Sequence, residues 1–510
     1  MYQAITWMFG FGFVLALVVA FGLGANDVAN MFGPSVGARA LTMRQALLVA
    51  AIFEFLGAVL MGAGVSDTIR SGITNIEFFI PRPDILAYGM MSALGGTGTW
   101  MIAATYWELP VSSTQAIISS VAGMAIVAKG WNAVVWTART PTFPYMKGMS
   151  FIALSWLVAP LLAAIASCFL FFIIRTFILR SKNAYQRSLF VLPVFTFITF
   201  FTVTWFTIVK AGVQYNWHKM PDAKKAWISI VVAAGTTMLS LFPGLRLLKK
   251  NVEADLEAEA AEKAASDSVI TVGADGPKSV DVEGALPAPG LLGSIQRSRV
   301  WRVLTYGMNY DIHAVVQTDE RVAEIHANAE MFDRKAELSF KYLQVCTACA
   351  NAFAHGSNEV ANAVGPLAAI YQVWQTGQIT SKAPIPTWLL AIGGLGICAG
   401  LATFGYTVMR AMGVKMTRLT NSRGFCVELC VAAVVIVASY CNLPMSSTLA
   451  TVGAIAGVGV WEGRSGFNAL LFAKMVAGWV LTMIAAVSLT CLFMAQGLYA
   501  PSRGSPLPGF

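Results

Sequence analysis

The sequence is poor in charge. Aspartate, glutamate, lysine and arginine make up 12% of its 510 residues, whereas hydrophobic residues make up 56% and the mean hydropathy is +0.65. Soluble proteins carry about 25% charged residues, so this composition excludes an ordinary soluble enzyme and indicates a polytopic membrane protein. The net charge of +9 is explained by basic loops on the cytoplasmic side of a bilayer, and no nucleic-acid partner is expected.

Other signals are missing as well. There is no Asn-x-Ser/Thr sequon, and the first apolar segment lacks the basic region that opens a signal peptide. Cys346 and Cys349 form a CxxC pair, but no second pair or histidine cluster completes a metal site, so we interpret the eight cysteines mainly as packing residues and expect no enzymatic cofactor. No alternating ten-residue pattern indicates a membrane β-barrel.

The chain is therefore predicted to be an all-α polytopic membrane protein. Shorter apolar pieces follow Pro110, Gly365 and Pro444 and predict half-helices or re-entrant hairpins. At about 20 residues per crossing, we expect roughly 10–12 spans. The apolar segments long enough to span lie near 5–23, 45–63, 85–107, 149–174, 189–210, 226–248, 342–354, 386–410, 425–443 and 468–496.

The chain divides into four parts by composition: a first membrane repeat with its following spans (1–248), a polar loop (249–341), a second membrane repeat (342–497) and a short tail (498–510). The loop is rich in alanine, acid, glycine and proline up to about residue 293, which predicts disorder. Aromatic residues then return, which predicts short helices packed on the membrane domain. Basic residues in 175–187 and 246–250 indicate that the loop is cytosolic, although four lysines between them lie on the other side.

One polar motif inside the apolar segments occurs twice. Gly24-Ala-Asn-Asp-Val-Ala-Asn30 is followed by Gly33-Pro34, and Gly356-Ser-Asn-Glu-Val-Ala-Asn362 is followed by Gly365-Pro366 with every spacing kept. Acids at membrane depth usually line an ion or substrate path. We expect the glycines and the Gly-Pro pairs to interrupt the helix and to free backbone groups for coordination.

A second motif also recurs. Pro110-Val-Ser-Ser-Thr114 begins 84 positions after Asn26, and Pro444-Met-Ser-Ser-Thr448 begins 86 positions after Asn358. Two rare motifs in the same order at nearly the same separation indicate an internal duplication. Duplication around discontinuous helices is typical of inverted-repeat transporters, with the site near mid-membrane between the repeats.

The first motif offers amide and carboxylate oxygens on one side of a helix. Such hard ligands suit an alkali or alkaline-earth cation and not zinc or copper. The alternative is that these residues only cap half-helices. The candidate cation ligands are Asn26, Asp27, Asn30, Asn358, Glu359 and Asn362.

The second motif places hydroxyl groups beside the free N–H groups of a helix N-terminus, which is a cradle for an anion. Two facing cradles would surround a small tetrahedral oxyanion. The alternative is that the hydroxyls bond only their own backbone. The candidate anion ligands are Ser112, Ser113, Thr114, Ser446, Ser447 and Thr448, together with Asp27 and Asn358.

Two further acids, Glu54 and Glu428, lie within apolar runs but are not equivalent in the repeat, because they follow Asn26 and Asn358 by 28 and 70 positions. An unpaired acid in a bilayer is costly. We expect each to pair with a partner that the sequence does not identify, to line the path, or to titrate.

The motifs GANDVAN, AHGSNEVANAVGP, the two PxSST runs and the segment SRGFCVE at 422–428 resemble the inorganic phosphate transporter family of sodium- or proton-coupled symporters, and most of all its eukaryotic sodium-phosphate branch. The resemblance covers about 25–175, part of the insert, and 342–495. It implies an all-helical inverted repeat, extracellular termini, a cytosolic central loop, frequent dimers, and phosphate bound with sodium between the repeats. Glu359, Gln115 and Leu449 depart from the common family residues, and both hydroxyl runs read Ser-Ser-Thr where Ser-Thr-Thr is commoner.

The sequence thus predicts a non-enzymatic plasma-membrane symporter that moves inorganic phosphate with sodium by alternating access. Sodium is favoured over protons by the amide and carbonyl oxygens beside each acid, and only the resemblance selects phosphate among tetrahedral oxyanions. The alternatives are a proton-coupled symporter, a passive channel or exporter, and a membrane-embedded enzyme.

Overall fold

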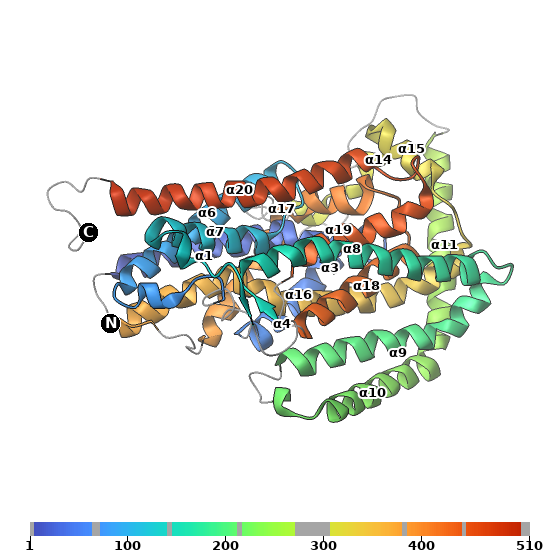
Figure 1. Ribbon diagram of the computed structural model, residues 1–510. Helices are drawn as coiled ribbons and strands as arrows, with labels where there is room; N and C mark the ends of the chain where they lie inside the picture. Colours follow the sequence, from blue (N-terminus) through green and yellow to red (C-terminus); the bar gives the residue numbers. More distant parts are fainter. Residues whose placement is uncertain are drawn as a thin grey trace, which may run out of the picture.

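The computed structural model describes residues 5–63, 72–139, 145–211, 217–270, 306–379, 385–440 and 445–500. These residues form an elongated bundle of helices (Figure 1). The first half contains α1 (Thr6–Leu23), η2 (Gly24–Val28), α2 (Ala29–Gly37), α3 (Met43–Val49), η3 (Ala50–Glu54), α4 (Phe55–Met61), η4 (Ile76–Phe79), α6 (Pro83–Tyr106), α7 (Ser113–Lys129), η5 (Trp131–Ala133), β1 (Ala138–Arg139), β2 (Met146–Lys147), α8 (Met149–Ile173), η6 (Ile174–Leu179), α9 (Ala184–Ala211), η7 (Trp217–Lys219), α10 (Asp222–Leu239) and η8 (Ser240–Gly244).

The remainder contains α11 (Leu245–Ile270), η9 (Gly307–Asn309), η10 (Ile312–Ala314), α14 (Val315–Thr318), α15 (Glu320–Asn328), α16 (Arg334–Thr376), α17 (Thr387–Arg410), η11 (Ala411–Lys415), α18 (Asn421–Tyr440), α19 (Ser447–Gly459), η12 (Val460–Glu462) and α20 (Ala469–Tyr499). The predicted all-α architecture is confirmed. The described residues depart from it only in the two-residue antiparallel pair of β1 and β2 and two isolated bridges.

The outer helices have the surface of a membrane protein. Large apolar side chains point outward from α8, α9 and α20, for example Leu157 at 72%, Phe190 at 82% and Leu492 at 65% exposure. Such a surface is stable only against hydrocarbon. Seven helical segments of the described chain are long and apolar enough to cross a bilayer; α6, α16 and α18 are comparably long but more polar, so the predicted count of 10–12 requires them.

Two hairpins enter the bundle. The first consists of α6 and α7 and packs against α20, whereas the second consists of α18 and α19 and packs against α8. Each hairpin therefore packs against a long helix of the opposite half, α20 for the first hairpin and α8 for the second. The short helices α7 and α19 begin at the Ser-Ser-Thr runs, as the half-helix prediction requires.

The helices that carry the repeated acid motif run antiparallel. Trp374, near the end of α16, stacks on Phe9 with ring centroids 4.6 Å apart and donates a hydrogen bond to Thr6 at the start of α1. The start of α1 and the end of α20 lie at one end of the bundle, and α11 and α15 lie at the other (Figure 1). The two helices that carry the motif therefore cross the bundle in opposite directions.

The expected breaks at the motifs are wrong. In the first copy α1, η2 and α2 follow one another, and the π-helical turn η2 only widens the helix. In the second copy α16 continues for 43 residues with Pro366 inside it. Dense packing by neighbouring helices compensates in a membrane protein for the hydrogen bond that proline removes.

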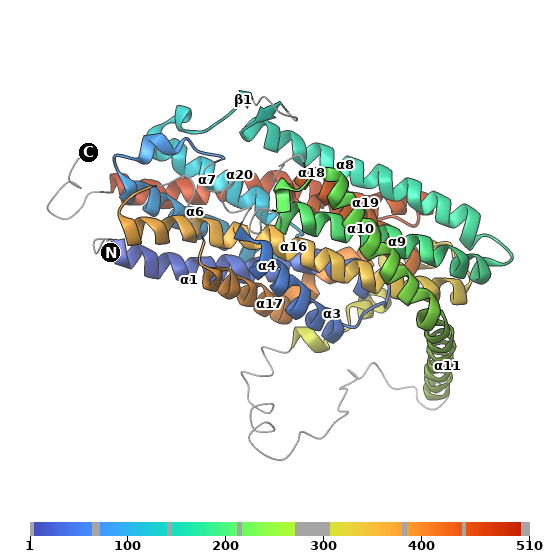
Figure 2. The same cartoon turned by 90° about the horizontal axis from the view of Figure 1, so that it is seen from below.

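The predicted insert boundaries also change. The boundary at 248 lies within α11, and the boundary at 341 lies within α16, whose first turn is capped by Asp333. Disorder is wrong for 253–270, which belong to α11 and project from the bundle (Figure 2). Alanine, glutamate and lysine favour helix, and Asp255 and Glu259 pair with Lys341 and Arg334 of α16. Residues 271–305 and 501–510 lie outside the described chain.

The end of the insert packs on the bundle as short helices. The imidazole Nε2 of His313 lies 3.2 Å from the Val36 carbonyl, and that of His326 lies 2.9 Å from the Val414 carbonyl. Burial lowers the pKa of both histidines below the usual value of 6.5. Both side chains are therefore neutral at pH 7 and tie the insert to two segments that adjoin the central motifs.

Candidate functional site

The two repeated acids lie in the interior of the bundle. Asp27 belongs to η2 and Glu359 to α16, and each side chain is 1% exposed. A π-helical turn leaves the regular hydrogen-bond ladder locally, and such turns are frequent at functional sites. The first acid therefore sits at an irregular turn, and the second sits on a regular helix.

Asp27 receives hydrogen bonds from both hairpins. The backbone N–H of Ser113 donates to Oδ2 at 3.1 Å, and the Thr448 hydroxyl donates to Oδ1 at 2.6 Å. Ser113 opens α7 in the first hairpin, whereas Thr448 lies in the first turn of α19 in the second. The carboxylate thus joins the N-termini of two half-helices.

Glu359 is held in the same way. The hydroxyls of Ser113 and Thr114 each donate to Oε2 at 3.0 Å, and the Ser447 hydroxyl donates to Oε1 at 3.2 Å. Asn362 adds an amide donor to Oε2 at 2.5 Å. Four of the six predicted hydroxyl residues, Ser113, Thr114, Ser447 and Thr448, therefore meet the predicted acids.

Ser112 and Ser446, the other two predicted hydroxyl residues, cap helices. Their hydroxyl oxygens accept from the backbone N–H of Gln115 at 3.1 Å and Leu449 at 3.3 Å, and so they cap α7 and α19. Capping satisfies one of the free N–H groups of a helix start. For these two residues the structure shows the local backbone bond that the sequence left open as an alternative. Pro444 lies outside the described residues.

The asparagines differ in what they bind. The Asn26 amide donates to the Leu109 carbonyl at 2.8 Å and accepts from the Val111 N–H at 3.0 Å, so it holds the tip of the first hairpin. The Asn30 amide donates to Thr448, while its Oδ1, fully buried, has no partner among the described residues. A buried acceptor without a donor is costly unless a cation or water completes it.

In the second copy, Asn362 donates to Ser113 Oγ at 3.0 Å and to Thr114 Oγ1 at 3.2 Å. Asn358 is half-buried and directs its amide toward Glu359 at 3.4 Å. The amides and hydroxyls of both copies therefore form one connected polar cluster around the two acids.

Glu54 has a partner that the sequence did not identify. Its Oε1 lies 2.6 Å from Nδ1 of His355, and both side chains have no exposed surface. The helices cross closely at this point, since Gly356 packs on the Glu54 carbonyl and Gly57 packs on the Phe353 carbonyl. The sequence offered one indication of this partner, because His355 directly precedes the second acid motif.

Glu428 lies in a neutral polar pocket. The hydroxyls of Ser35 and Thr347 donate to its two oxygens at 2.5 and 2.6 Å, and the Gln344 amide lies 3.4 Å from Oε1. Ser35 follows the first motif, while the other two residues precede the second. Glu428 therefore links the two halves, and within the described part of the chain it has no basic partner.

The charges in this interior are unbalanced. Among the salt bridges of the described residues, none pairs Asp27, Glu359 or Glu428 with lysine or arginine, and Glu54 has only His355. Buried charges are normally paired or coordinate ions. No cluster of three His, Cys, Asp or Glu side chains suited to a metal exists in the described part, so the oxygens available are those of amides, hydroxyls and isolated carboxylates.

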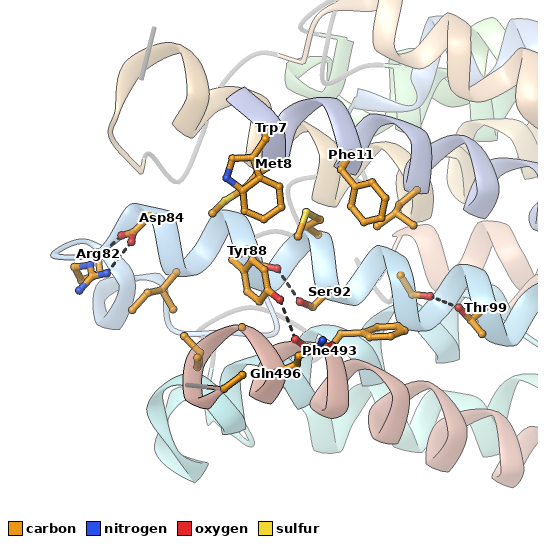
Figure 3. A pocket seen from close by; sticks show the side chains of 17 residues that line it. Trp7, Met8, Phe11, Arg82, Asp84, Tyr88, Ser92, Thr99, Phe493 and Gln496 are labelled. Atoms are coloured by element: carbon orange, nitrogen blue, oxygen red, sulfur yellow. Dashed lines mark hydrogen bonds and ion pairs between the residues drawn. The ribbon is translucent and has the colours of Figure 1, made fainter. Parts of the chain in front are cut away.

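A well-formed cavity lies away from the polar cluster. It measures about 630 Å³ and is lined by α1, α6 and the end of α20, with Trp7, Tyr88 and Phe493 around it (Figure 3). None of the motif residues lines it. Within the cluster, Asp27 and Glu359 are each only 1% exposed, whereas Asn358 is half-buried.

A bundle of membrane helices that holds acids between two hairpins is an arrangement typical of membrane transporters. The chain matches the family described as the phosphate transporter family over residues 23–490 and belongs to that family.

The relatives agree with this membership. The chain is 31% identical to inorganic phosphate transporter 2-1, chloroplastic, of Arabidopsis thaliana, over 96% of this chain and 71% of the relative. It is 27% identical to sodium-dependent phosphate transporter 1 of Rattus norvegicus, over 96% and 95% of the two chains. A solved structure titled the sodium-dependent phosphate transporter superposes with a TM-score of 0.71 at 31% identity, covering 96% of this chain and 98% of the other. The predicted family is confirmed.

Proposed function

We propose that this member of the phosphate transporter family is a symporter that moves inorganic phosphate together with sodium by alternating access. The observation that carries the proposal is the central pair of buried acids. Asp27 and Glu359 have no basic partner among the described residues, and each is contacted by hydroxyl or amide groups of both hairpins. A site of this kind attracts cations first and holds an anion only once they are bound.

The strength of the coupling between sodium and phosphate binding follows from Coulomb's law. A phosphate about 6 Å from one carboxylate is repelled by about 3 kcal/mol per unit charge at an effective dielectric constant near 20. A sodium ion at each acid cancels this repulsion. Sodium and phosphate then raise each other's affinity by the same factor, because binding linkage is reciprocal.

The unpartnered oxygen favours sodium over a proton as the coupling ion. Asn30 Oδ1 has no donor among the residues that the structure describes, and it lies beside Thr448, which binds Asp27. A protonated Asp27 would supply a donor to one oxygen only, whereas a cation gathers several. We assign sodium to Asp27 and Asn30 in one half and to Glu359 and Asn362 in the other, with Asn26 and Asn358 adjoining.

Phosphate is assigned to the four hydroxyls that face the acids, Ser113, Thr114, Ser447 and Thr448, and to the free backbone N–H groups at the starts of α7 and α19. Asp27 and Asn358 border the same space. Ser112 and Ser446 contribute through the caps that shape these helix starts. Phosphate transport by the family and the sodium-dependent relatives supports this assignment.

We place the protein in a plasma membrane with the central insert in the cytosol, as the basic loops indicate. The insert-side position of α11 and α15, opposite the start of α1 and the end of α20, is consistent with this orientation. A homodimer is a further expectation from the family resemblance.

Proton coupling is the second candidate, because Glu54 and His355 form a buried pair in which Glu54 Oε2 and His355 Nε2 have no partner in the described ranges. The test is uptake of labelled phosphate into proteoliposomes under a sodium gradient, a potassium gradient and a pH gradient, each imposed alone. Sodium-driven accumulation supports the proposal. Accumulation driven only by the pH gradient supports proton coupling, and equilibration without accumulation under any gradient indicates a passive channel.

A further inference from the structure

The tip of the first hairpin carries a charged residue in an unusual conformation. Glu108 has φ of 55°, in the left-handed region that non-glycine residues seldom occupy. Residues persist there when their surroundings hold them. Here Arg410 Nη2 binds Oε1, and Lys415 Nζ binds Oε2 at 2.9 Å. We call these three residues the tip latch.

The tip latch is joined directly to the acid site. Immediately after Glu108, the Leu109 carbonyl and the Val111 N–H both bond the amide of Asn26. The Ser113 N–H then bonds Asp27. The position of Glu108 therefore sets the position of a short loop whose backbone contacts two residues of the first motif.

On its other side the tip latch contacts the insert. Arg410 Nη1 donates to the Tyr310 hydroxyl at 2.6 Å, and its guanidinium lies 5.6 Å from the centre of that ring. Tyr310 in turn packs on Tyr406 of α17, with ring centroids 4.4 Å apart. One arginine thus joins the hairpin tip to the polar insert.

The tip latch lies between the site and the insert end of the bundle. The start of α17 belongs to the opposite end, where Trp388 packs on Tyr371 near the end of α16. Arg410 closes α17 and Lys415 closes η11, so both lie toward the insert. The side chains are 31%, 19% and 24% exposed for Glu108, Arg410 and Lys415, which places them at a rim and not in the core.

The two hairpins are unequal in this respect. In the sequence, Glu108-Leu109-Pro110 corresponds to Asn442-Leu443-Pro444, so the second tip has a neutral amide where the first has a carboxylate. An ion pair of this kind is therefore specific to the first hairpin and is not a shared feature of the two repeats.

We propose that the tip latch is the closure of the transport site on the insert side, and that Glu108 must leave Arg410 and Lys415 in each cycle for phosphate to pass toward the insert. The inference rests on the proposed alternating-access function. It adds positioning residues, because the tip latch acts on Asn26 and Asp27 through the hairpin backbone.

The first test joins the tip latch covalently. In a Glu108→Cys/Lys415→Cys variant, a reducible bis-thiol reagent that spans the two positions should abolish sodium-driven phosphate uptake, and a reductant should restore it. An Arg82→Cys/Asp84→Cys variant serves as the matched control, since this pair at the start of α6 is similarly exposed and its members are only two positions apart in the chain. Wild-type protein treated alike reports on the natural cysteines. Uptake that persists in the cross-linked latch variant overturns the proposal.

The second test removes the charges. Glu108→Gln and Arg410→Gln should each favour the state that is open toward the insert. Less protein is then in the state that binds sodium from the opposite side of the membrane, where α1 starts and α20 ends. The sodium concentration for half-maximal uptake from that opposite side should therefore rise several-fold. In the double variant the two effects should not add, since Arg410 is one of the two cations that Glu108 binds and both changes break the same ion pair. Asp84→Asn should leave half-saturation unchanged. If all three variants lower only thermal stability, the tip latch is merely structural.

The controls separate this inference from the proposed function. If wild-type protein shows no gradient-driven accumulation, the symport proposal fails before the tip latch is tested. If wild-type protein accumulates phosphate and the cross-linked variant does so equally, only the tip latch fails.

Discussion

The hydroxyl of Thr448 lies 2.6 Å from Oδ1 of Asp27, although 421 positions separate the two residues. The acid of the first repeat is therefore held by the hairpin of the second. Glu359 shows the reverse, since Ser113 and Thr114 of the first hairpin bind it. Each half completes the other's site, so neither half is expected to bind ions by itself.

Replacement of Thr448 by valine should weaken sodium binding strongly. The change keeps the shape of the side chain but removes a hydrogen bond to a charged group, which is worth about 1.5–3 kcal/mol. This corresponds to a rise of about 10- to 150-fold in the sodium concentration for half-maximal uptake. Thr448→Ser keeps the hydroxyl and is the control. Equal sodium dependence of both variants and wild type would remove Thr448 from the site.

Asp27→Asn should make phosphate binding less dependent on sodium. The substitution removes one repulsive charge together with its cation, so residual binding should vary less steeply with sodium while transport falls sharply. The measurement is a phosphate-binding isotherm at several sodium concentrations and fixed pH, repeated one pH unit lower. An unchanged sodium slope would exclude Asp27 from coupling, and a wild-type response to pH in place of sodium would indicate proton coupling.

Alanine substitutions of the adjacent serines Ser112 and Ser113 should have different effects. Ser113→Ala removes a donor to Glu359 and should mainly raise the phosphate and sodium concentrations for half-saturation. Ser112→Ala removes the cap of α7 and should lower the free energy of unfolding by about 0.5–2 kcal/mol. Uptake curves and thermal unfolding in detergent measure the two quantities. The assignment is wrong if Ser112→Ala shifts half-saturation more than Ser113→Ala does.

Acid should loosen the docked part of the insert. Burial lowers the pKa of His313 and His326 below the usual 6.5, so the undocked chain takes up protons more readily. The stabilisation is complete above pH 6.5 and is lost as the pH falls from there toward the lower folded pKa values. Hydrogen exchange of residues 312–328 should accelerate between pH 7.5 and 5.5 beyond its intrinsic pH dependence. A His313→Gln/His326→Gln variant should lose this difference.

Deletion within the insert should have graded effects. Removal of 271–288 should leave uptake intact, because a segment rich in alanine, glycine, proline and acid does not build a core. Removal of 255–270 also deletes the partners of Lys341 and Arg334 and should slightly lower the melting temperature. Surface expression is measured beside uptake for both. Abolished transport in a well-expressed 271–288 deletion would contradict this view of the insert.

Sequence predicted the helical membrane fold, the family and the duplicated motifs, because these properties are written in local composition and in spacing along the chain. It also placed Ser113, Thr114, Ser447 and Thr448 among the candidate ligands. It misjudged the helix at each motif, since whether glycine and proline break a membrane helix depends on how neighbouring helices pack around it. It likewise predicted disorder in residues that α11 orders through contacts with α16.

The pairings within the site were decided by tertiary structure alone. Nothing local joins Glu54 to His355, 301 positions away; the close crossing at Gly57 and Gly356 brings them together. In the same way, the exchange of hydroxyls between the halves depends on which hairpin packs against which long helix. Side chains with several hydrogen-bonding choices take the partner that helix packing places within reach, and helix packing is a property of the whole chain.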